Sequence, residues 1–597
     1  MRIERLVVAL IVAPLCACSA TPPAVPHLSA EEAEARIVQG RALLDAGRPV
    51  EAEAVFAAAA AADGDSLRTR MWVLRAWMDQ GGRSNDTLDA LDALDRAGEK
   101  GLEMTYLYGM AFARRAQGYV ADNVGDSSVQ MNFIDAADRL ERAVRADPVR
   151  YHDAFLPLAD AAWYVEKPEL ARWAADHAVE LQPSSPEAWL LRGRIALAQF
   201  GELATDEPTG PAAEATWAEA AASFQHALER FDTPDDARAA RELADAATQL
   251  GHTLLWKQKG PEATEAYATA MAWNPEGFPY PKAYDLLRAL PKDPEDERPS
   301  GFRAALELGR TRFEEHAGPA DPQAGTLLWW LGWARFIDAE WAGSEEAFQA
   351  ALARGQRYSN GWFYVGLARQ YRKDSEGALQ AMHAGWDADP AAMVAVIASA
   401  GGSLRAFENL LGWCASQEPP RNADAAFLSE MLSQSLPDEP RYWNNLGLFL
   451  RDQGEQLEFA AHKKKEKADR KVLDELYARS FAAYERSLGL VPDDPQLLND
   501  TALMLIYHVG PDYPRAETMF RRAIELTEQR LAATDLPEED RARFEQTRTD
   551  AKENLQRMLD HLAGKDEPEA DESADDSAKD AQPDGADAPK SPSGGGR

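Results

Sequence analysis

The sequence predicts an all-α fold of stacked helix pairs, and three observations support this fold class. Apolar and small residues recur at a spacing of 34 positions, and a fixed period of this size is typical of repeat architectures. Ala, Leu, Glu and Arg dominate, and β-branched runs are scarce outside the first fifteen residues, which favours helix. At 597 residues, the chain exceeds one ordinary core, so several domains or one long solenoid are expected.

The recurrence is clearest between residues 325 and 392. Six apolar or small residues are followed, 34 positions later, by another apolar or small residue. The first set is Leu328, Leu331, Gly332, Ser344, Phe348 and Ala351, and the matching second set is Trp362, Val365, Gly366, Ala378, Met382 and Gly385. Small residues let two helices approach closely, and large ones fill the space between repeats. Because one helix pair cannot bury its apolar face alone, neighbouring pairs must stack.

This pattern resembles the tetratricopeptide repeat family. In that family the first helix carries a large apolar residue, a Leu and a small residue, and the second carries Ala, an aromatic residue and Ala. The resemblance implies a right-handed superhelical solenoid whose first helices line a concave groove. The copies are centred, in chain order, on Gly40/Phe56, a degenerate pair at 67–100, Gly109/Leu140, Phe155/Ala178, Trp189/Phe224, Gly251/Tyr267, Gly332/Phe348, Gly366/Met382, Gly447/Tyr484 and Ala502/Phe520.

Prolines and charge runs divide the chain further. Five prolines between 279 and 299 and an acidic run at 293–297 predict an irregular connection, residues 393–439 read as irregular helix, and a charged helix near 538–562 is expected to cap the stack. The predicted segments are a signal peptide (1–17), a Pro-rich tether (18–28), an N-terminal solenoid (29–275), the connection (276–324), a C-terminal solenoid (325–562) with an insertion near 455–477, and a disordered acidic tail (563–597).

The N-terminus predicts export. Arg2 and Arg5 precede an apolar stretch at 6–15 that is too short to span a bilayer. The run Leu-Cys-Ala-Cys-Ser at 15–19 resembles a bacterial lipoprotein box, which implies a lipid on Cys18 and, with Ser19 next, an outer-membrane protein facing the periplasm. The alternative is an ordinary secretory signal in which Cys18 has no role. Without Cys16 and Cys18, only Cys414 remains, so no disulfide framework is expected.

Charge and motifs exclude several classes of function. The chain carries a formal charge of −35, which would repel a phosphate backbone, so nucleic acid is not an expected partner. The ten histidines are scattered, and we find no metal-ligand spacing, phosphate loop or nucleophile turn. We therefore expect no enzymatic activity, no cofactor and no metal.

Two sets of residues are candidates for the groove. Trp329, Trp333 and Phe336 share one helix face, and the equivalent positions of the next repeat are Phe363, Leu367 and Gln370. These aromatics either line a ligand groove or pack against a neighbouring repeat. The second set, which resembles the carboxylate-binding residues of some family members, is Arg441, Asn444, Asn445 and Arg451. Asp500 on the adjoining repeat argues against a complete carboxylate site.

One basic run stands out in this acidic chain. Residues 462–467 read His-Lys-Lys-Lys-Glu-Lys, and Arg470 and Lys471 follow. It is either a solvated helix extension or a docking patch for an acidic partner, an anionic lipid or the chain's own tail.

These observations favour a non-catalytic scaffold that is anchored at the bacterial cell envelope and binds partner proteins or peptides. The alternatives are an assembly or secretion factor that recruits an envelope enzyme, and a peptidoglycan-binding module that uses Trp329 and Trp333.

Overall fold

The computed structural model describes residues 28–565, except 63–66, 81–83, 99, 122–124, 208, 232–236, 291–299, 400–403 and 534. Every regular element among these residues is a helix, which confirms the predicted fold class. The chain divides into two compact units, Met1–Pro319 and Ala320–Arg597. The predicted signal peptide, Cys18 and all but the first three residues of the predicted acidic tail lie outside the described residues and stay predictions.

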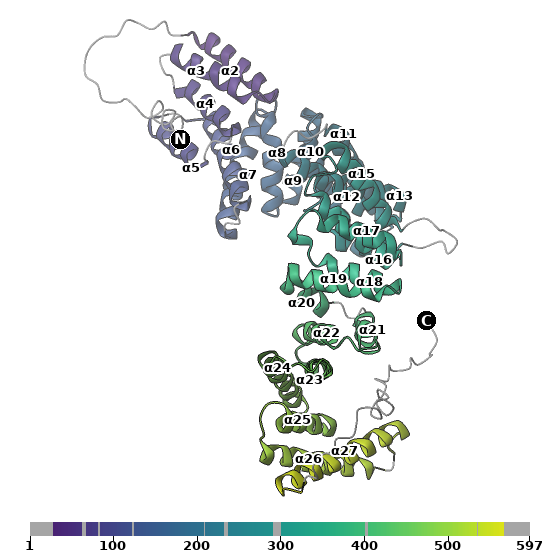
Figure 1. Ribbon diagram of the computed structural model, residues 1–597. Helices are drawn as coiled ribbons and strands as arrows, with labels where there is room; N and C mark the ends of the chain where they lie inside the picture. Colours follow the sequence, from purple (N-terminus) through teal and green to yellow (C-terminus); the bar gives the residue numbers. More distant parts are fainter. Residues whose placement is uncertain are drawn as a thin grey trace, which may run out of the picture. The chain divides into compact units, whose positions relative to one another are not determined.

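In the first unit, most helices that follow one another in the chain lie side by side (Figure 1). They are α2 (Ala30–Asp45), α3 (Pro49–Ala62), α4 (Leu67–Asp79), α5 (Ser84–Arg96), α6 (Leu102–Ala121), α7 (Asp126–Ala146), the short 3₁₀ helix η1 (His152–Ala154), α8 (Phe155–Tyr164), α9 (Pro168–Leu181), α10 (Pro186–Asp206), α11 (Pro211–Arg230), α12 (Ala237–Trp256), α13 (Gly260–Trp273), α14 (Tyr280–Arg288) and α15 (Gly301–Ala317).

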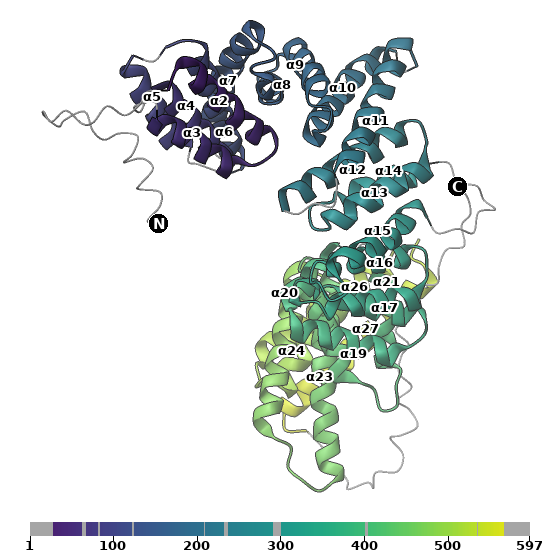
Figure 2. The same cartoon turned by 90° about the horizontal axis from the view of Figure 1, so that it is seen from above.

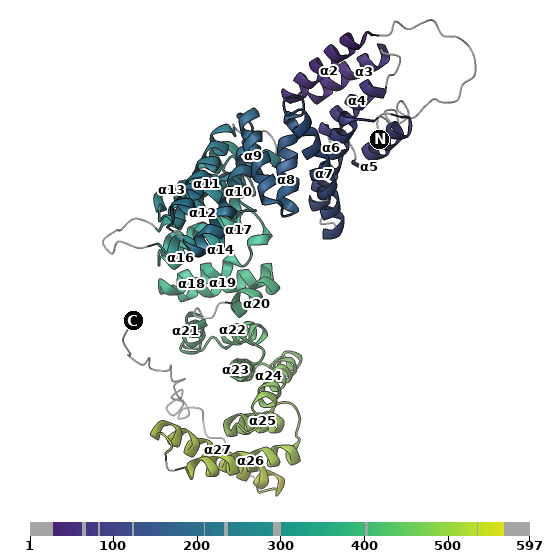
Figure 3. The same ribbon diagram turned by 180° about the vertical axis from the view of Figure 1, so that it is seen from behind.

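The second unit is built in the same way, and Figure 3 shows its last helices, α25 to α27, packed in chain order. Its helices are α16 (Ala324–Ile337), α17 (Trp341–Leu352), the 3₁₀ helix η2 (Gln356–Tyr358), α18 (Gly361–Tyr371), α19 (Ser375–Ala388), α20 (Pro390–Ser399), α21 (Leu404–Ala415), α22 (Asn422–Ser435), α23 (Pro440–Lys463), α24 (Arg470–Leu490), α25 (Pro495–Tyr507), α26 (Tyr513–Leu531) and α27 (Glu538–Leu562).

Helix starts follow from local sequence. Ser29 caps α2: its Oγ accepts from the Glu32 backbone N–H at 3.2 Å, and the Glu32 carboxylate accepts from the Ser29 N–H at 2.8 Å, a complete capping box. Helices α9, α10 and α25 begin with proline, whose missing N–H costs nothing in the first turn. The sequence therefore places helix starts where the structure has them.

Close contact between a glycine and a large side chain, often a ring, holds several of the pairs together. A Cβ built on Gly332 of α16 would lie 2.9 Å from the Phe348 ring of α17, and one on Gly251 would lie 2.4 Å from the Tyr267 ring. The Ser344 hydroxyl also donates to the Gly332 carbonyl at 2.9 Å. The repeating small and large residues of the sequence thus mark where the two helices of a pair touch.

The predicted irregular connection at 276–324 is wrong for much of its length, because it contains α14 and α15. Pro279 and Pro281 occupy the start of α14, where proline is tolerated. Ser300 caps α15 by accepting from the Arg303 N–H at 3.4 Å. Helix α15 then packs on α13, so this stretch continues the stack of the first unit.

Candidate functional site

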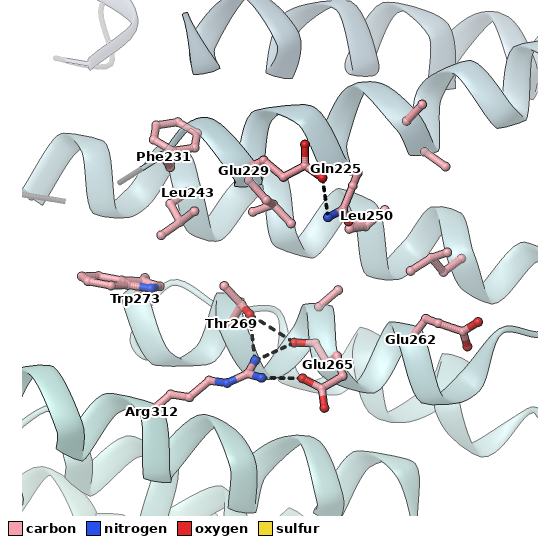
Figure 4. Close-up of a pocket in the computed structure, with 15 residues that line it drawn as sticks. Gln225, Glu229, Phe231, Leu243, Leu250, Glu262, Glu265, Thr269, Trp273 and Arg312 are labelled. Carbon is pink, nitrogen blue, oxygen red and sulfur yellow. Dashed lines mark hydrogen bonds and ion pairs between the residues drawn. The ribbon is translucent and has the colours of Figure 1, made fainter. Parts of the chain in front are cut away.

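A groove of about 840 Å³ lies on one face of α12 in the first unit (Figure 4). Its floor is mainly apolar, and acidic side chains lie along its rim. It is lined by Ala221, Ala222, Gln225, Leu228, Glu229 and Phe231 of α11 and its end, by Leu243, Leu250 and Leu254 of α12, by Glu262, Glu265, Ala266, Thr269 and Trp273 of α13, and by Arg312 of α15.

The floor follows from the sequence of α12. Leu243, Leu250 and Leu254 are spaced by seven and four residues, which places them on one helix face. Small residues of the flanking helices, such as Ala222, keep the groove open. Trp273 stands toward one end (Figure 4), and its ring stacks on His316 with a centroid separation of 4.1 Å.

The rim carries net negative charge. Arg312 is already occupied: it donates to Thr269 Oγ1 at 2.9 Å and to the Glu265 backbone carbonyl at 3.1 Å, and it pairs with the Glu265 carboxylate. Glu229 accepts from Gln225 at 3.3 Å and remains exposed. Glu262 is exposed and forms no ion pair within the described part of the chain. Glu229 also lies 3.2 Å from His226 Nδ1 and 3.8 Å from Arg230 Nη1, so Glu262 is the less engaged of these two exposed carboxylates at the rim.

The opposite face of α12 lines a second, polar pocket of about 320 Å³. Arg241, Asp245, Thr248 and His252 recur at three- or four-residue steps on this face, and Lys282 comes from α14. Asp245 is paired with Arg194 at 3.1 Å. No hydrogen bond or ion pair joins the side chain of Arg241 or Lys282 to another described residue, so the pocket offers two cations.

His252 adds an unused polar atom to this pocket. Its Nε2 is buried and has no hydrogen-bond partner among the described residues. Burial, and then the nearby charge of Lys282, lowers the pKa of His252 to about 4, so the ring is neutral at pH 7. With Arg241 and Lys282 beside it, the pocket is suited to an acidic group.

A third polar cluster in the first unit is structural. Arg75 donates to Tyr106 Oη at 2.9 Å and pairs with Asp153 at 2.9 Å and with Asp79 at 2.6 Å. Tyr106 Oη in turn donates to Asp153 at 2.5 Å. Because these side chains satisfy one another inside the stack, they cross-link α4, α6 and η1 and leave little for a ligand.

In the second unit, two of the four predicted groove aromatics, Phe336 and Phe363, are core residues. Phe363 and Leu367 are each 1% exposed, and Phe336 is 9% exposed, so the prediction that they line a groove is wrong. Helices α20 and α21 contact α18 and share one core with Phe363 and Leu367, which covers that face.

The remaining members of this set are partly buried. Trp329 donates from Nε1 to Asn360 Oδ1 at 3.0 Å and packs against Tyr364 at a centroid distance of 5.9 Å. Trp333 is half-buried and lies against Trp330. Gln370 accepts from the Ser375 hydroxyl at 3.1 Å. The packing alternative therefore describes Trp329 and Trp333 better than an open groove does.

The predicted carboxylate-binding set is not assembled into one site. Arg441 pairs with Glu408 at 2.9 Å, whereas Arg451 pairs with Asp452 at 2.8 Å. They are ten residues apart on one helix, about 15 Å along its axis. Asn444 and Asn445 are half-buried between them. With both arginines neutralised by carboxylates, this face lacks the free cations that a carboxylate requires.

Sequence reasoning missed the groove and the polar pocket on α12. The available signals were the Leu243–Leu250–Leu254 spacing and the polar stripe half a turn away. Neither signal shows that the flanking helices leave space beside them.

Two general features were also surveyed. Within the described ranges, no group of three or more His, Cys, Asp or Glu side chains is placed to hold a metal ion. In the same ranges, no single helix has both the length and the apolar composition of a membrane span, although α20 and α21 together, bent by 118°, meet those two criteria.

The fold and its grooves define a helical repeat protein. A family model described as "Tetratricopeptide repeat" matches residues 27–66, 156–209 and 213–253. These three stretches therefore contain tetratricopeptide repeats.

Three solved structures resemble the chain at low sequence identity. No curated protein matches it. Among solved structures, the tetratricopeptide domain of P58(IPK) is 15% identical with a TM-score of 0.18, covering 76% of this chain and 99% of its own. Yeast Tom70 is 11% identical with a TM-score of 0.21, covering 77% and 98%. The C-terminal part of a repeat protein from Cytophaga hutchinsonii is 16% identical with a TM-score of 0.21, covering 42% and 99%.

Proposed function

We propose that the chain is a non-catalytic scaffold that binds a segment of a partner protein in the groove on α12. The tetratricopeptide fold supports protein–protein interaction in general. One observation carries the particular site: an apolar floor and an acidic rim meet in a groove of about 840 Å³. This volume lies within the range of about 300–1,000 Å³ that is usual for binding pockets.

The chemistry of the groove selects an amphipathic, basic segment. Apolar side chains of a bound helix would pack on Ala222 and Leu228 and on the small exposed parts of the floor leucines, as in other helix-in-groove complexes. Lys or Arg on its flanks would approach Glu229 and Glu262. Complementary rim charges contribute mainly to specificity and to the rate of association.

Fluorescence anisotropy with the full chain tests this proposal. The probes are two labelled helical peptides of about 16 residues, or four turns, with identical apolar positions and either Lys or Glu elsewhere. We expect the Lys peptide to bind more tightly. Glu229→Lys/Glu262→Lys should weaken its binding about tenfold, since two exposed attractions become repulsions.

The control separates the groove from the charge of the whole chain. Glu180 and Glu202 are exposed on α9 and α10 of the same unit and do not line the groove. If Glu180→Lys/Glu202→Lys weakens binding equally, the attraction is non-specific and the groove is not the site. Ala222→Trp, which fills the groove from its exposed edge, should also block binding, and unchanged affinity in this variant would contradict the proposal.

We also propose that the polar pocket on the other face of α12 receives an acidic group of the partner. The unpaired Arg241 and Lys282 and the buried Nε2 of His252 support this assignment. A C-terminal or side-chain carboxylate would satisfy all three. Lys282→Ala should weaken binding of an acid-ended peptide but not of its amidated form, and equal losses for both peptides would refute the role.

We further propose that the chain is exported and lipid-anchored through Cys18, at the outer membrane facing the periplasm. The support is the resemblance of residues 15–19 to a lipoprotein box. Labelling with a clickable palmitate analogue in a bacterial host should mark the wild-type chain and not Cys18→Ala. Label retained in Cys18→Ala would reject lipidation at this residue.

A further inference from the structure

Helices α23 and α24 form a hairpin that is longer than the α16–α17 pair of the same unit (Figure 2). They have 24 and 21 residues, against 14 and 12 in α16 and α17. The last buried residue of α23 is Gly454, which lies against Tyr477. Glu455 pairs with His508, just after α25, at 3.3 Å, and Gln456 donates to the Pro420 carbonyl at 3.1 Å. Residues 457–463 therefore continue about 10 Å beyond these contacts, at 1.5 Å per residue.

The end of this hairpin, residues 457–472, is called the hairpin tip below. Its turn is well defined: Lys465 has φ of 59°, its N–H donates to the His462 carbonyl at 2.9 Å, and the Glu466 N–H donates to the Ala461 carbonyl at 2.9 Å. The hairpin tip is therefore a preformed structure that presents its side chains without further folding.

The hairpin tip concentrates positive charge on an acidic protein. Residues 462–471 contain six basic and two acidic residues, in a chain of net charge −35. Arg470 pairs with Asp474 at 3.0 Å. In contrast, five exposed lysines have no side-chain hydrogen bond or ion pair to any described residue: Lys463, Lys464, Lys465, Lys467 and Lys471. Elsewhere in the unit, Lys552 pairs with Glu528 at 2.8 Å.

Apolar side chains are exposed among these lysines. Phe459 is 69% exposed, Leu457 is 42% exposed and Val472 is 44% exposed. Phe459 and Lys463 are four residues apart on α23 and are therefore neighbours on one helix face. Exposed aromatic and aliphatic side chains next to lysines are typical of surfaces that enter the headgroup layer of a membrane.

We propose that the hairpin tip docks on the anionic surface of a lipid bilayer. The lysines would attract acidic headgroups, while Phe459, Leu457 and Val472 would enter the boundary of the acyl chains. An acidic protein or the chain's own acidic tail would satisfy the lysines but would leave these apolar side chains in water. The projection of about 10 Å also exceeds the Debye length of about 8 Å at physiological salt, so the charge of the acidic body is partly screened at the bilayer.

Vesicle flotation with the full chain tests the proposal. Cys18→Ser is present in every sample, so a lipid on that residue makes no contribution. The probes are vesicles of phosphatidylcholine alone and of phosphatidylcholine mixed with phosphatidylglycerol. We expect binding only to the mixed vesicles, and binding should fall as salt is raised.

Variants at the hairpin tip separate charge from apolar insertion. Lys463→Gln/Lys464→Gln/Lys465→Gln should weaken binding about 100-fold, since each lysine near an anionic surface contributes about fivefold. Phe459→Ser should weaken it about tenfold and keep the salt dependence. The matched control is Lys167→Gln/Lys259→Gln/Lys373→Gln, which removes three exposed lysines elsewhere and should bind like the parent.

Four results would overturn the proposal. They are equal binding to both kinds of vesicle, unchanged binding of the triple variant at the hairpin tip, an equal loss in the control, and binding seen only after deletion of residues 566–597. The last result would identify the acidic tail as the occupant of the hairpin tip. Phe459 and the six substituted lysines are exposed, and circular dichroism checks that each variant is folded.

Discussion

The contact between Gly332 and Phe348 makes a quantitative prediction about what holds a repeat together. In Gly332→Ala, the new Cβ would lie 2.9 Å from two carbons of the Phe348 ring and 3.0 Å from a third. The ring cannot retreat easily, because it is fully buried and stacks on Tyr364 with a centroid separation of 5.0 Å. The two helices must therefore separate or the ring must leave its rotamer.

The magnitude follows from two opposing effects. Overpacking a filled core costs about 2–3 kcal/mol when the neighbours cannot move. Replacing a helical glycine by alanine returns about 1 kcal/mol. We therefore expect Gly332→Ala to lower the free energy of unfolding by about 1–2 kcal/mol.

The second unit contains a matched control. Gly412 of α21 is also helical, but a Cβ there would meet no atom within 4 Å, so Gly412→Ala should gain about 0.5–1 kcal/mol. Urea unfolding followed by circular dichroism and tryptophan fluorescence would measure both variants, with the slopes compared to check cooperativity. Phe348→Leu should reduce the cost of Gly332→Ala, because the smaller side chain makes room. Equal stability of the two alanine variants, or no coupling to Phe348→Leu, would refute the reasoning.

Three further predictions concern buried groups. Asp153→Ala should lower the free energy of unfolding by about 3 kcal/mol, since it leaves the buried Arg75 without one of its carboxylate partners. Burial opposes ionisation of Asp153, but Arg75 nevertheless holds the pKa of Asp153 below its usual value. Urea melts should therefore show the contribution of Asp153 above about pH 4 and its loss as the pH falls further, and an Asp153→Ala variant as stable as the parent at pH 7 would contradict this role. NMR titration should give His252 a pKa of about 4. The free energy of unfolding should then fall as the pH is lowered from about 6.5 to 4, and His252→Gln should remove this dependence. An ordinary pKa for His252 would mean that water enters the pocket and would contradict the prediction. Burial raises the pKa of Cys414 to about 12. In a Cys16→Ser/Cys18→Ser variant, Ellman's reagent should therefore react with Cys414 only after the protein is unfolded. Rapid reaction of the native protein would show that α21 opens.

The helix pairs were predictable because their signals are local. Gly332 and Phe348 are 16 positions apart, and their contact is set by one turn between two helices. The same logic located the glycines that face Phe56 and Tyr484. The prolines at 279–299 were misleading, since a proline count does not distinguish a loop from the first turn of a helix such as α14.

The candidate sites depended on contacts between distant segments. The helical spacing of Trp329, Phe363 and Leu367 is equally compatible with side chains that line a groove and with side chains that pack in a core. The structure decided the matter for Phe363 and Leu367, because α20 and α21 return over α18 and cover them. Conversely, Leu250 and Leu254 read as ordinary core positions, yet small residues on the flanking helices leave a groove above them.

The sequence by itself determined the class of fold, the pairing of neighbouring helices and the charge of the chain, because these depend on periodicity, caps and composition. Only the tertiary structure decided which faces stay open. That choice depends on how side chains from several helices fill or leave space, and no single helix carries this information. The α12 groove, its polar pocket and the basic hairpin tip are therefore properties of the packed stack.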